Sequence, residues 1–297
     1  MDVSADALAS FAVFADHLNF THAAAELHIS QPALHVKIRK LAQALGRPLY
    51  HRVGRRLVLT ADGEAVARFA RAHDERMADF LAEFAGTAPR RPVVLAAGQG
   101  AYLYLLGDTI RAALADEPTR LRLINCDHRQ MLAAVRNGQA HLGVGVLDVL
   151  PDDLTAAELA SFPQVLLMPD DHRLARQDAV TLPDLAGASL VVPPQHRPHR
   201  ALLERALRTT GTPWTVAVEA EGWPLITHFV TLGVGLAIVN GCVPAPPGVV
   251  ARPVTDLPPV TYHVVHQPSA RADPRVAALL ERMRAPNNPD ATAALAP

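Results

Sequence analysis

The chain lacks the features that mark secreted and membrane-spanning proteins. Its 297 residues include two cysteines, Cys126 and Cys242, which lie far apart and form no CxxC motif. No apolar run approaches the roughly 18 residues of a membrane span. The first residues, MDVSADALASF, contain two acids and no basic residue, whereas a secretory signal begins with a basic region. These absences predict a cytoplasmic chain with reduced cysteines and no membrane partner.

Patterns typical of catalysis and of metal sites are also missing. No Ser/His/Asp set, carboxylate pair or phosphate loop stands in an arrangement that needs catalysis, so neither enzyme activity nor a cofactor is expected. Of the 14 histidines, His196 and His199 are the pair considered as metal ligands, and no metal site is expected. A redox pair of Cys126 and Cys242 is the less favoured alternative to two small buried side chains.

Charge is unevenly distributed along the chain, although the formal net charge is only −1. Residues 1–60 contain seven Lys and Arg, all within 30–60, where there is no acid. The remainder carries 21 basic and 25 acidic residues. A basic module on an acidic body is expected when one face meets phosphate. The length allows two domains, or three small ones, with buried cores.

The first 60 residues predict a helix–turn–helix. Ser4 precedes a helical pattern, and Thr21 is expected to cap a short second helix, HAAAELH. A turn at 28–30 leads to Ser30, the expected N-cap of a third helix with Pro32 in its first turn. A proline there removes no internal hydrogen bond. The third helix has its inward-facing residues at helical spacing: Leu34, Ile38, Leu41 and Leu45.

The outward face of the third helix carries the expected DNA contacts. The second helix of a helix–turn–helix enters the major groove with its N-terminal part, where Gln and Arg bond base edges and apolar groups meet thymine methyls. Segment 49–60 predicts a hairpin with an arginine-rich tip, suited to the minor groove or flanking phosphates. The alternative is that the three helices only pack together and that their basic face is solvated and binds no DNA. The predicted contacts are Thr21, Ser30, Gln31, Pro32, His35, Val36, Lys37, Arg39, Lys40, Arg52, Arg55 and Arg56.

Residues 61–91 predict a long linker helix and a hinge. Thr60 is the expected cap, and Gly63 is a weak position within the helix. Large and small apolar residues then repeat at intervals of four and three, which is the seam of a coiled coil. Burial against the chain's own body is the alternative to a homodimer, which is favoured because two-fold DNA sites need two readers. The predicted seam is Val66, Ala70, His73, Met77, Phe80 and Phe84.

Residues 20–64, FTHAAAELHISQPALHVKIRKLAQALGRPLYHRVGRRLVLTADGE, resemble the winged helix–turn–helix and linker-helix start of LysR-type bacterial transcriptional regulators. The shared positions include Phe20-Thr21, the run Ser30–Leu34, Leu45-Gly46 and Leu59-Thr60. The resemblance implies a DNA-binding regulator that acts as a homodimer or homotetramer, with RNA polymerase as an expected partner. His35 and Val36 stand where many members have polar residues, so no operator sequence is implied.

From residue 92 onward, strand-like and helix-like stretches alternate, which predicts an open, mainly parallel α/β architecture. Short pieces, such as VRNGQAHLGVGV and VTLGVGLAIVN, resemble the family's effector domain, which has two lobes of the periplasmic-binding-protein type. The expected lobes are 92–160 with 267–285, and 161–266. A disordered tail is expected at 286–297. A solute receptor or an enzyme using the same cleft are the alternatives, and an architectural DNA binder is a third.

The expected effector site lies between the lobes, because open α/β sheets bind ligands at the carboxyl ends of strands. Segment 98–101 offers small residues and free N–H groups. QHRPHR, 195–200, offers arginines and histidines that suit a carboxylate or phosphate, so an anionic effector is expected; a solvated basic loop is the alternative. The predicted site comprises Gly98, Gln99, Gly100, Ala101, Asn125, His128, His196, Arg197, His199, Arg200 and Trp223.

Overall fold

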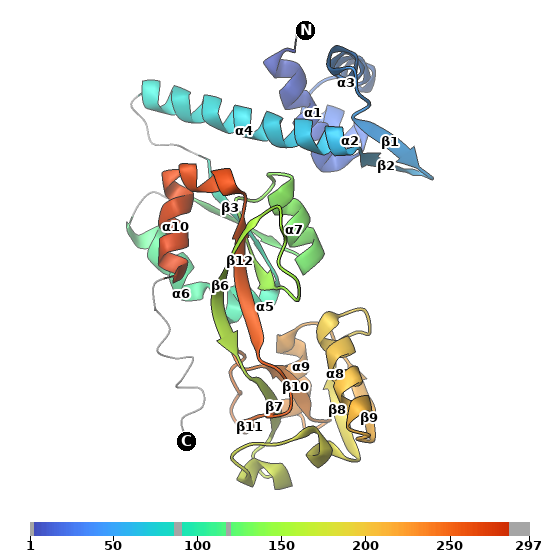
Figure 1. Ribbon diagram of the computed structural model, residues 1–297, viewed down its shortest axis with the longest axis vertical. Helices are drawn as coiled ribbons and strands as arrows, with labels where there is room; N and C mark the ends of the chain where they lie inside the picture. The colour runs from blue at the N-terminus through green and yellow to red at the C-terminus, as the bar shows by residue number, and fades with distance from the viewer. Residues whose placement is uncertain (1–2, 86–90, 117–119, 285–297) are drawn as a thin grey trace.

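The computed structural model describes residues 3–85, 91–116 and 120–284. The expected tail at 286–297 and most of the expected hinge lie outside this range. The chain forms three parts along its long axis (Figure 1), namely an N-terminal helical domain, a long helix across its base, and two α/β lobes. This arrangement confirms the predicted fold class.

The N-terminal domain contains three helices and a hairpin. Its elements are α1 (Ala5–His17), α2 (Phe20–Glu26), α3 (Gln31–Leu45), β1 (Tyr50–Val53) and β2 (Arg56–Leu59). Phe11, Phe14 and Leu34 are fully buried in its core. Thr21 does not cap α2 as expected. Asn19 does, because its Oδ1 accepts the Thr21 and His22 amides at 2.9 and 3.2 Å, and the helix therefore begins at Phe20.

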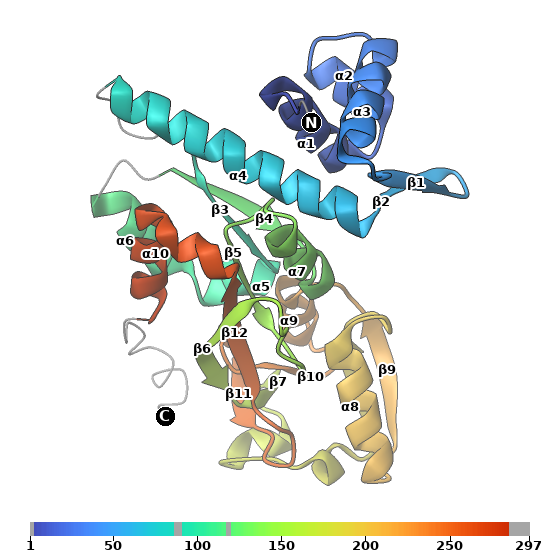
Figure 2. The ribbon, with the colours of Figure 1, turned by 45° about the horizontal axis from the view of Figure 1, so that its top comes forward.

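Helix α4 (Ala61–Phe84) leads out of the hairpin. The Thr60 hydroxyl accepts the Gly63 amide at 2.9 Å, which confirms Thr60 as the cap. Gly63 is a packing requirement rather than a weak position, because a Cβ there would lie 1.8 Å from the Leu49 carbonyl oxygen. The hairpin and the start of α4 are therefore held in close contact, while the hairpin tip projects away from the body (Figures 1 and 2).

The first lobe is built on a five-stranded sheet in the order β4-β3-β5-β12-β6. Strand β3 runs parallel to β4 and β5, and β12 is antiparallel to β5 and β6. Two helices, α5 and α6, follow β3. The lobe's elements are β3 (Val93–Ala97), α5 (Gln99–Tyr104), α6 (Gly107–Asp116), β4 (Leu121–Asn125), α7 (His128–Arg136), β5 (Leu142–Val146), β6 (Thr155–Phe162), β12 (Val260–His266), η3 (Pro268–Ala272) and α10 (Pro274–Arg284).

The second lobe contains a three-stranded sheet, β10-β7-β11, and the parallel pair β8-β9. Its elements are β7 (Gln164–Pro169), η1 (Arg173–Arg176), η2 (Leu182–Leu185), β8 (Ala188–Val192), α8 (Pro198–Thr209), β9 (Trp214–Glu219), α9 (Trp223–Thr231), β10 (Ala237–Asn240) and β11 (Val249–Pro253). Segment 260–266 does not belong to this lobe as expected. It returns to the first lobe as β12, where Val264 pairs with Val144 and Ala157, because its alternating apolar side chains complete that sheet's core.

Candidate functional site

The first turn of α3 is exposed and capped as the sequence predicts. The Ser30 hydroxyl accepts the Ala33 amide at 3.3 Å, and Pro32 sits in the first turn. Leu34, Ile38 and Leu41 are buried, which turns the other side of the helix outward. The exposed residues on that side are Gln31, Pro32, His35, Val36, Arg39 and Lys40. This surface is therefore open to a partner.

Two side chains of this surface are held by α2. The Thr21 hydroxyl donates to Gln31 Oε1 at 3.4 Å. The His35 ring stacks on Phe20, with ring centres 3.5 Å apart and planes 14° from parallel. Both contacts restrict rotamers of an otherwise exposed face, so less side-chain entropy is lost when a partner binds.

Lys37 is not part of the free surface, contrary to expectation. Its Nζ pairs with Asp6 Oδ2 at 2.7 Å, and the side chain lies against α1. The reason is its place on the helix, one residue before the buried Ile38 and close to the α1–α3 contact. Lys37 therefore holds two helices together rather than extending toward a groove.

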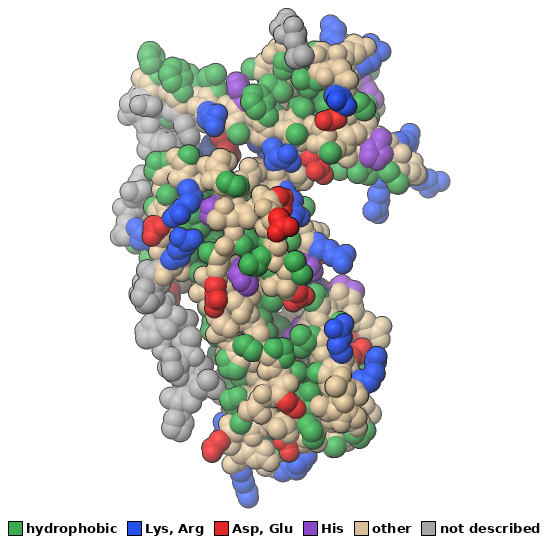
Figure 3. Space-filling view, viewed as in Figure 1, with side chains coloured by type: hydrophobic (Ala, Val, Ile, Leu, Met, Phe, Trp, Pro, Cys, Tyr) green, Lys and Arg blue, Asp and Glu red, His purple; other side chains and the backbone are tan. Residues whose placement is uncertain are grey.

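The hairpin forms the predicted wing. Val53 pairs with Arg56, so Gly54 and Arg55 make the turn. Gly54 has φ +60°, which favours glycine. Arg52, Arg55 and Arg56 are all exposed, and Figure 3 shows basic side chains at the end of the hairpin. The wing and α3 thus offer cations and hydrogen-bond donors side by side.

Helix α4 has three faces with different partners. Ala67 and Ala70 are buried in the N-terminal core, and Val66 packs against it. Val66 and Ala70 are therefore not available to a second copy, contrary to the predicted seam. His73 is half-buried. Farther along, the apolar face is open (Figure 3), with Met77, Phe80, Leu81 and Phe84 exposed by 46, 59, 55 and 83%.

The third face of α4 is charged and lies on the first lobe. Arg71 donates to the main-chain oxygen of Asn137 and pairs with Asp16 of α1. Gln139 Nε2 donates to the same Asp16 carboxylate at 2.8 Å. Glu75 lies 3.3 Å from His141 Nε2. We name Asp16, Arg71, Glu75, Asn137, Gln139 and His141 the interdomain clamp. It joins the N-terminal domain, α4 and the first lobe through polar contacts.

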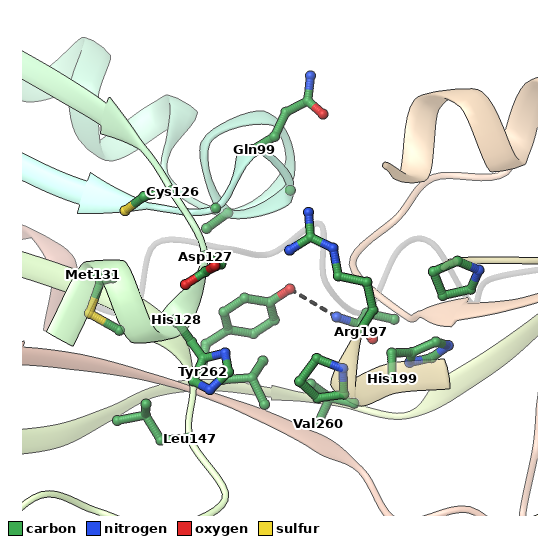
Figure 4. A pocket seen from close by; sticks show the side chains of 18 of the residues that line it. Gln99, Cys126, Asp127, His128, Met131, Leu147, Arg197, His199, Val260 and Tyr262 are labelled. Atoms are coloured by element: carbon green, nitrogen blue, oxygen red, sulfur yellow. Dashed lines mark hydrogen bonds between the residues drawn. The ribbon is translucent and has the colours of Figure 1, made fainter. Parts of the chain in front are cut away.

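A cleft of about 1050 Å³ separates the two lobes. Figure 4 shows its polar side chains converging from both sides. Ten of the eleven predicted effector residues line it, namely Gly98, Gln99, Gly100, Ala101, Asn125, His128, His196, Arg197, His199 and Trp223. The strand ends and helix starts on which they lie were recognisable in the sequence, which explains this agreement.

Arg200 is the exception, and its predicted role is wrong. Its side chain is 4% exposed and points into the second lobe, where Nε pairs with Glu204 at 2.6 Å. Nη1 donates to the Pro193 carbonyl oxygen at 3.2 Å, and the guanidinium lies 5.2 Å from the Trp214 ring centre. Because α8 begins at Pro198, Arg200 falls on the helix side that carries the buried Leu203 and Leu207.

Arg197 does face the cleft, but it is already paired with Glu221. On the opposite side, Asp127 caps α7 by accepting the Gln130 amide at 2.9 Å, and Gln130 Oε1 accepts the Asp127 amide. Both carboxylates line the cleft. The basic segment 195–200 therefore does not present a free arginine to the cleft. It presents the Arg197–Glu221 ion pair, and the Asp127 carboxylate lines the opposite side.

His199 lies between the cleft and the second lobe. Its Nε2 contacts the Ile238 carbonyl oxygen at 2.9 Å, and its ring meets the Trp223 ring edge-on, 4.9 Å away. Burial lowers the pKa of His199, which favours the neutral ring. A neutral ring that donates through Nε2 has Nδ1 left as an acceptor.

Sequence reasoning missed Gln164, Asn240 and Tyr262, which also line the cleft. Asn240 Nδ2 donates to the Tyr262 hydroxyl at 2.9 Å, the dashed contact in Figure 4. Gln164 Nε2 donates to the Pro258 carbonyl oxygen at 2.9 Å. Asn240 ends a recognisable strand, and this was the available signal. Gln164 begins β7 and Tyr262 lies within β12, and neither carries a motif.

Cys126 and Cys242 are both free thiols. Burial raises the pKa of Cys126 above its usual value and that of Cys242 to about 11. A raised pKa disfavours the reactive thiolate. Across the described parts of the chain, no three His, Cys, Asp or Glu gather as metal ligands would, and no helix there has the length and apolarity to cross a membrane.

An exposed surface of helix and wing, followed in the chain by two lobes with a cleft between them, defines a ligand-responsive DNA-binding regulator. Comparison with known proteins agrees. Residues 5–64 match the family model described as a bacterial regulatory helix-turn-helix protein of the lysR family, and residues 86–286 match the LysR substrate binding domain. The chain belongs to the LysR family of transcriptional regulators. Its function is therefore regulation by DNA and effector binding rather than catalysis.

Relatives cover most of the chain. The Hca operon transcriptional activator HcaR of Escherichia coli is 29% identical over 78% of this chain and 79% of its own length. A RuBisCO operon transcriptional regulator of Allochromatium vinosum is 26% identical over 81% of this chain and 80% of its own length. A full-length OxyR variant from Pseudomonas aeruginosa superposes with a TM-score of 0.73 at 22% identity, covering 96% of both chains. CbnR, a LysR family transcriptional regulator, superposes with a TM-score of 0.56 at 20% identity, covering 95% of this chain and 100% of the CbnR chain. These structures share the fold.

Proposed function

We propose that this regulator recognises a specific operator through the first turn of α3 and the wing, in the cytoplasm, and acts on promoters together with RNA polymerase. The supporting observation is the exposed, capped start of α3, with Gln31 held by Thr21 and three free arginines on the adjacent hairpin. Gln31 and Arg39 would bond base edges in the major groove, and Pro32 and Val36 would pack on thymine methyls. The wing arginines would contact phosphates or the minor groove.

We further propose that α7 transmits the state of the cleft to the DNA-binding domain. The first turn of α7 lines the cleft through His128, Gln130 and Met131. Its C-cap is Asn137, whose carbonyl oxygen accepts from Arg71. A helix of nine residues moves as a unit, so an effector that shifts its first turn also shifts the interdomain clamp. The ligand would thereby change the population of N-terminal domain poses.

The open apolar face of α4 supports a homodimer, or a tetramer built from two such pairs. Met77, Phe80, Leu81 and Phe84 form a contiguous exposed patch on the last two turns of the helix. Exposed patches of this kind mark interaction sites. Two copies paired along this face would present two α3 helices to one duplex, as two-fold operators require.

Operator binding tests the proposed recognition surface. Fluorescence anisotropy with DNA from upstream of the chain's own gene would be measured for the native protein, Gln31→Ala and a control, Gln43→Ala, exposed at the other end of α3. Gln31→Ala should reduce the preference for this DNA over unrelated DNA, by about 1–3 kcal/mol per lost bidentate contact. Gln43→Ala should not. Equal affinity of the native protein for both DNAs would contradict the proposal.

A further inference from the structure

We infer that the effector of the cleft is a neutral or cationic molecule that donates hydrogen bonds, rather than a small carboxylate. The inference rests on the proposed effector role of the cleft. It departs from the sequence-based expectation of an anion, which depended on Arg197 and Arg200. Only Arg197 reaches the cleft, and it is paired.

Two buried amide oxygens in the cleft wall have no hydrogen-bond partner among the described residues. Gln164 and Asn240 are neighbours across the β7–β10 pair and are 1 and 6% exposed. The Pro258 carbonyl oxygen fixes Nε2 of Gln164, which leaves Oε1 as the unpartnered atom. Asn240 Nδ2 contacts the Tyr262 hydroxyl, and its Oδ1 is likewise unpartnered. Buried polar atoms in proteins nearly always have a partner. Both residues line the cleft. Because their oxygens are covered, a donor of the occupant becomes their partner when these side chains turn toward the cleft.

The charges of the cleft point the same way. Its carboxylates are Asp127, Asp148 and Glu221, against one arginine. Arg197 is bound to Glu221, and His199 is kept near neutrality by burial. An entering carboxylate would therefore meet excess negative charge. A donor-bearing neutral group or a cation would meet acceptors.

The helix starts around the cleft do not offer an open anion site. Helix α7 is capped by Asp127, so the Gln130 amide in its first turn already has a carboxylate partner. Glu221 directly precedes the N-cap of α9 and is held by Arg197, the N-cap of α8. A carboxylate of the protein thus lies where both second-lobe helices begin. Helix α5 has only six residues and a correspondingly small dipole.

The remaining walls favour a ring. Trp223, Met131, Leu147, Val260 and Ile226 line the cleft from both lobes. Apolar walls with a few converging acceptors are typical of a pocket for a flat molecule with polar edges. A ring that carries amide, amino, amidine or hydroxyl donors satisfies the apolar walls and the buried oxygens together.

Three near-isosteric probes separate the charge classes: benzamidinium (a cationic donor), benzamide (a neutral donor) and benzoate (an anionic acceptor). Thermal unfolding of the full-length protein would be followed with each probe at equal millimolar concentration, because a ligand of the native state raises Tm. We expect both donors to raise Tm at least twice as much as benzoate. Gln164→Met, which removes the oxygen at similar volume, should halve the donor shifts, while the exposed Gln177→Met should not.

Several outcomes would overturn the inference: a larger shift with benzoate, no shift with either donor, or unchanged donor shifts in Gln164→Met. The ranking of probes on the native protein needs no variant, so misfolding of Gln164→Met cannot obscure the result. Operator binding without any probe is measured separately. Its loss in the native protein would contradict the proposed function, whereas a benzoate preference with intact operator binding would contradict only the ligand class.

Discussion

Arg71 of the linker helix donates to the main-chain oxygen of Asn137, the residue that ends α7. The same guanidinium pairs with Asp16 of α1, so one side chain joins the DNA-binding domain, the linker helix and the first lobe. The contact is polar, and Nε of Arg71 is buried without a partner in the described structure. Polar interfaces between domains are the ones that move most readily. The polar contact of Arg71 therefore lies at the C-terminal end of α7, and the first turn of the same helix lines the cleft.

Replacing Arg71 by alanine should release the N-terminal domain from the first lobe. Asp16 and the Asn137 carbonyl oxygen would lose their shared partner, while the cores of both domains would be unaffected. Small-angle X-ray scattering should then give a larger radius of gyration than for the native protein. Arg76→Ala, at an exposed position on the same helix, is the control. Identical scattering of Arg71→Ala and native protein would show that the interdomain clamp does not hold the pose.

The two arginines of segment 195–200 should respond oppositely to mutation. Arg200→Ala leaves Glu204 without its partner beside the core, and removal of one partner of a buried pair costs about 3 kcal/mol of unfolding free energy or more. Arg197→Ala breaks a largely exposed pair, worth about 1 kcal/mol or less. Urea unfolding measures both. A larger loss for Arg197→Ala would reverse the assigned roles.

Phe80→Asp should weaken self-association. Phe80 is 59% exposed at the centre of the apolar face of α4, and a charge there would be buried without a partner in a paired helix. Loss of a central aromatic contact is expected to weaken dimerisation by about 2 kcal/mol or more. Sedimentation equilibrium measures this, with Ala65→Asp, exposed near the start of the same helix, as control. An unchanged dimer would place the interface elsewhere.

Stability should fall as the pH is lowered through the ordinary range of histidine. Burial lowers the pKa of His199 below 6.5 in the folded chain. The unfolded chain therefore takes up the proton first, and the stabilising contribution is present above about pH 6.5 and lost below it. Chemical unfolding between neutral and mildly acidic pH should show a smaller pH dependence in His199→Gln. The exposed His22→Gln should retain the native slope, and an equal slope in His199→Gln would refute the assignment.

The recognition helix was predictable because its determinants are local. Ser30, Pro32 and the spacing of Leu34, Ile38 and Leu41 fix the start and the buried side within four turns, and the structure has both. Most of the cleft was predictable for a related reason, since strand ends and helix starts could be read from short patterns. The same patterns could not show that Lys37 pairs with Asp6, a residue on another helix.

The surroundings of Arg197 and Arg200 depend on where each residue falls relative to α8. Arg197 is the N-cap, and Arg200 lies on the buried side of the helix. Both lie in one basic hexapeptide, yet one faces the cleft and the other a core. Likewise, the apolar spacing along α4 predicted a long helix, but whether Ala70 meets a second copy or its own domain depended on where α1 packs. The meeting of Gln164 and Asn240 required the pairing of strands 76 residues apart in sequence.

The sequence by itself determined the family, the reader helix, the wing and the alternation that builds two lobes, because hydrophobic spacing and capping act over a few residues. Only the tertiary structure decided which polar groups are paired and which residues line the cleft. Burial and partnership are properties of packed surfaces, and these form between segments that no local pattern connects.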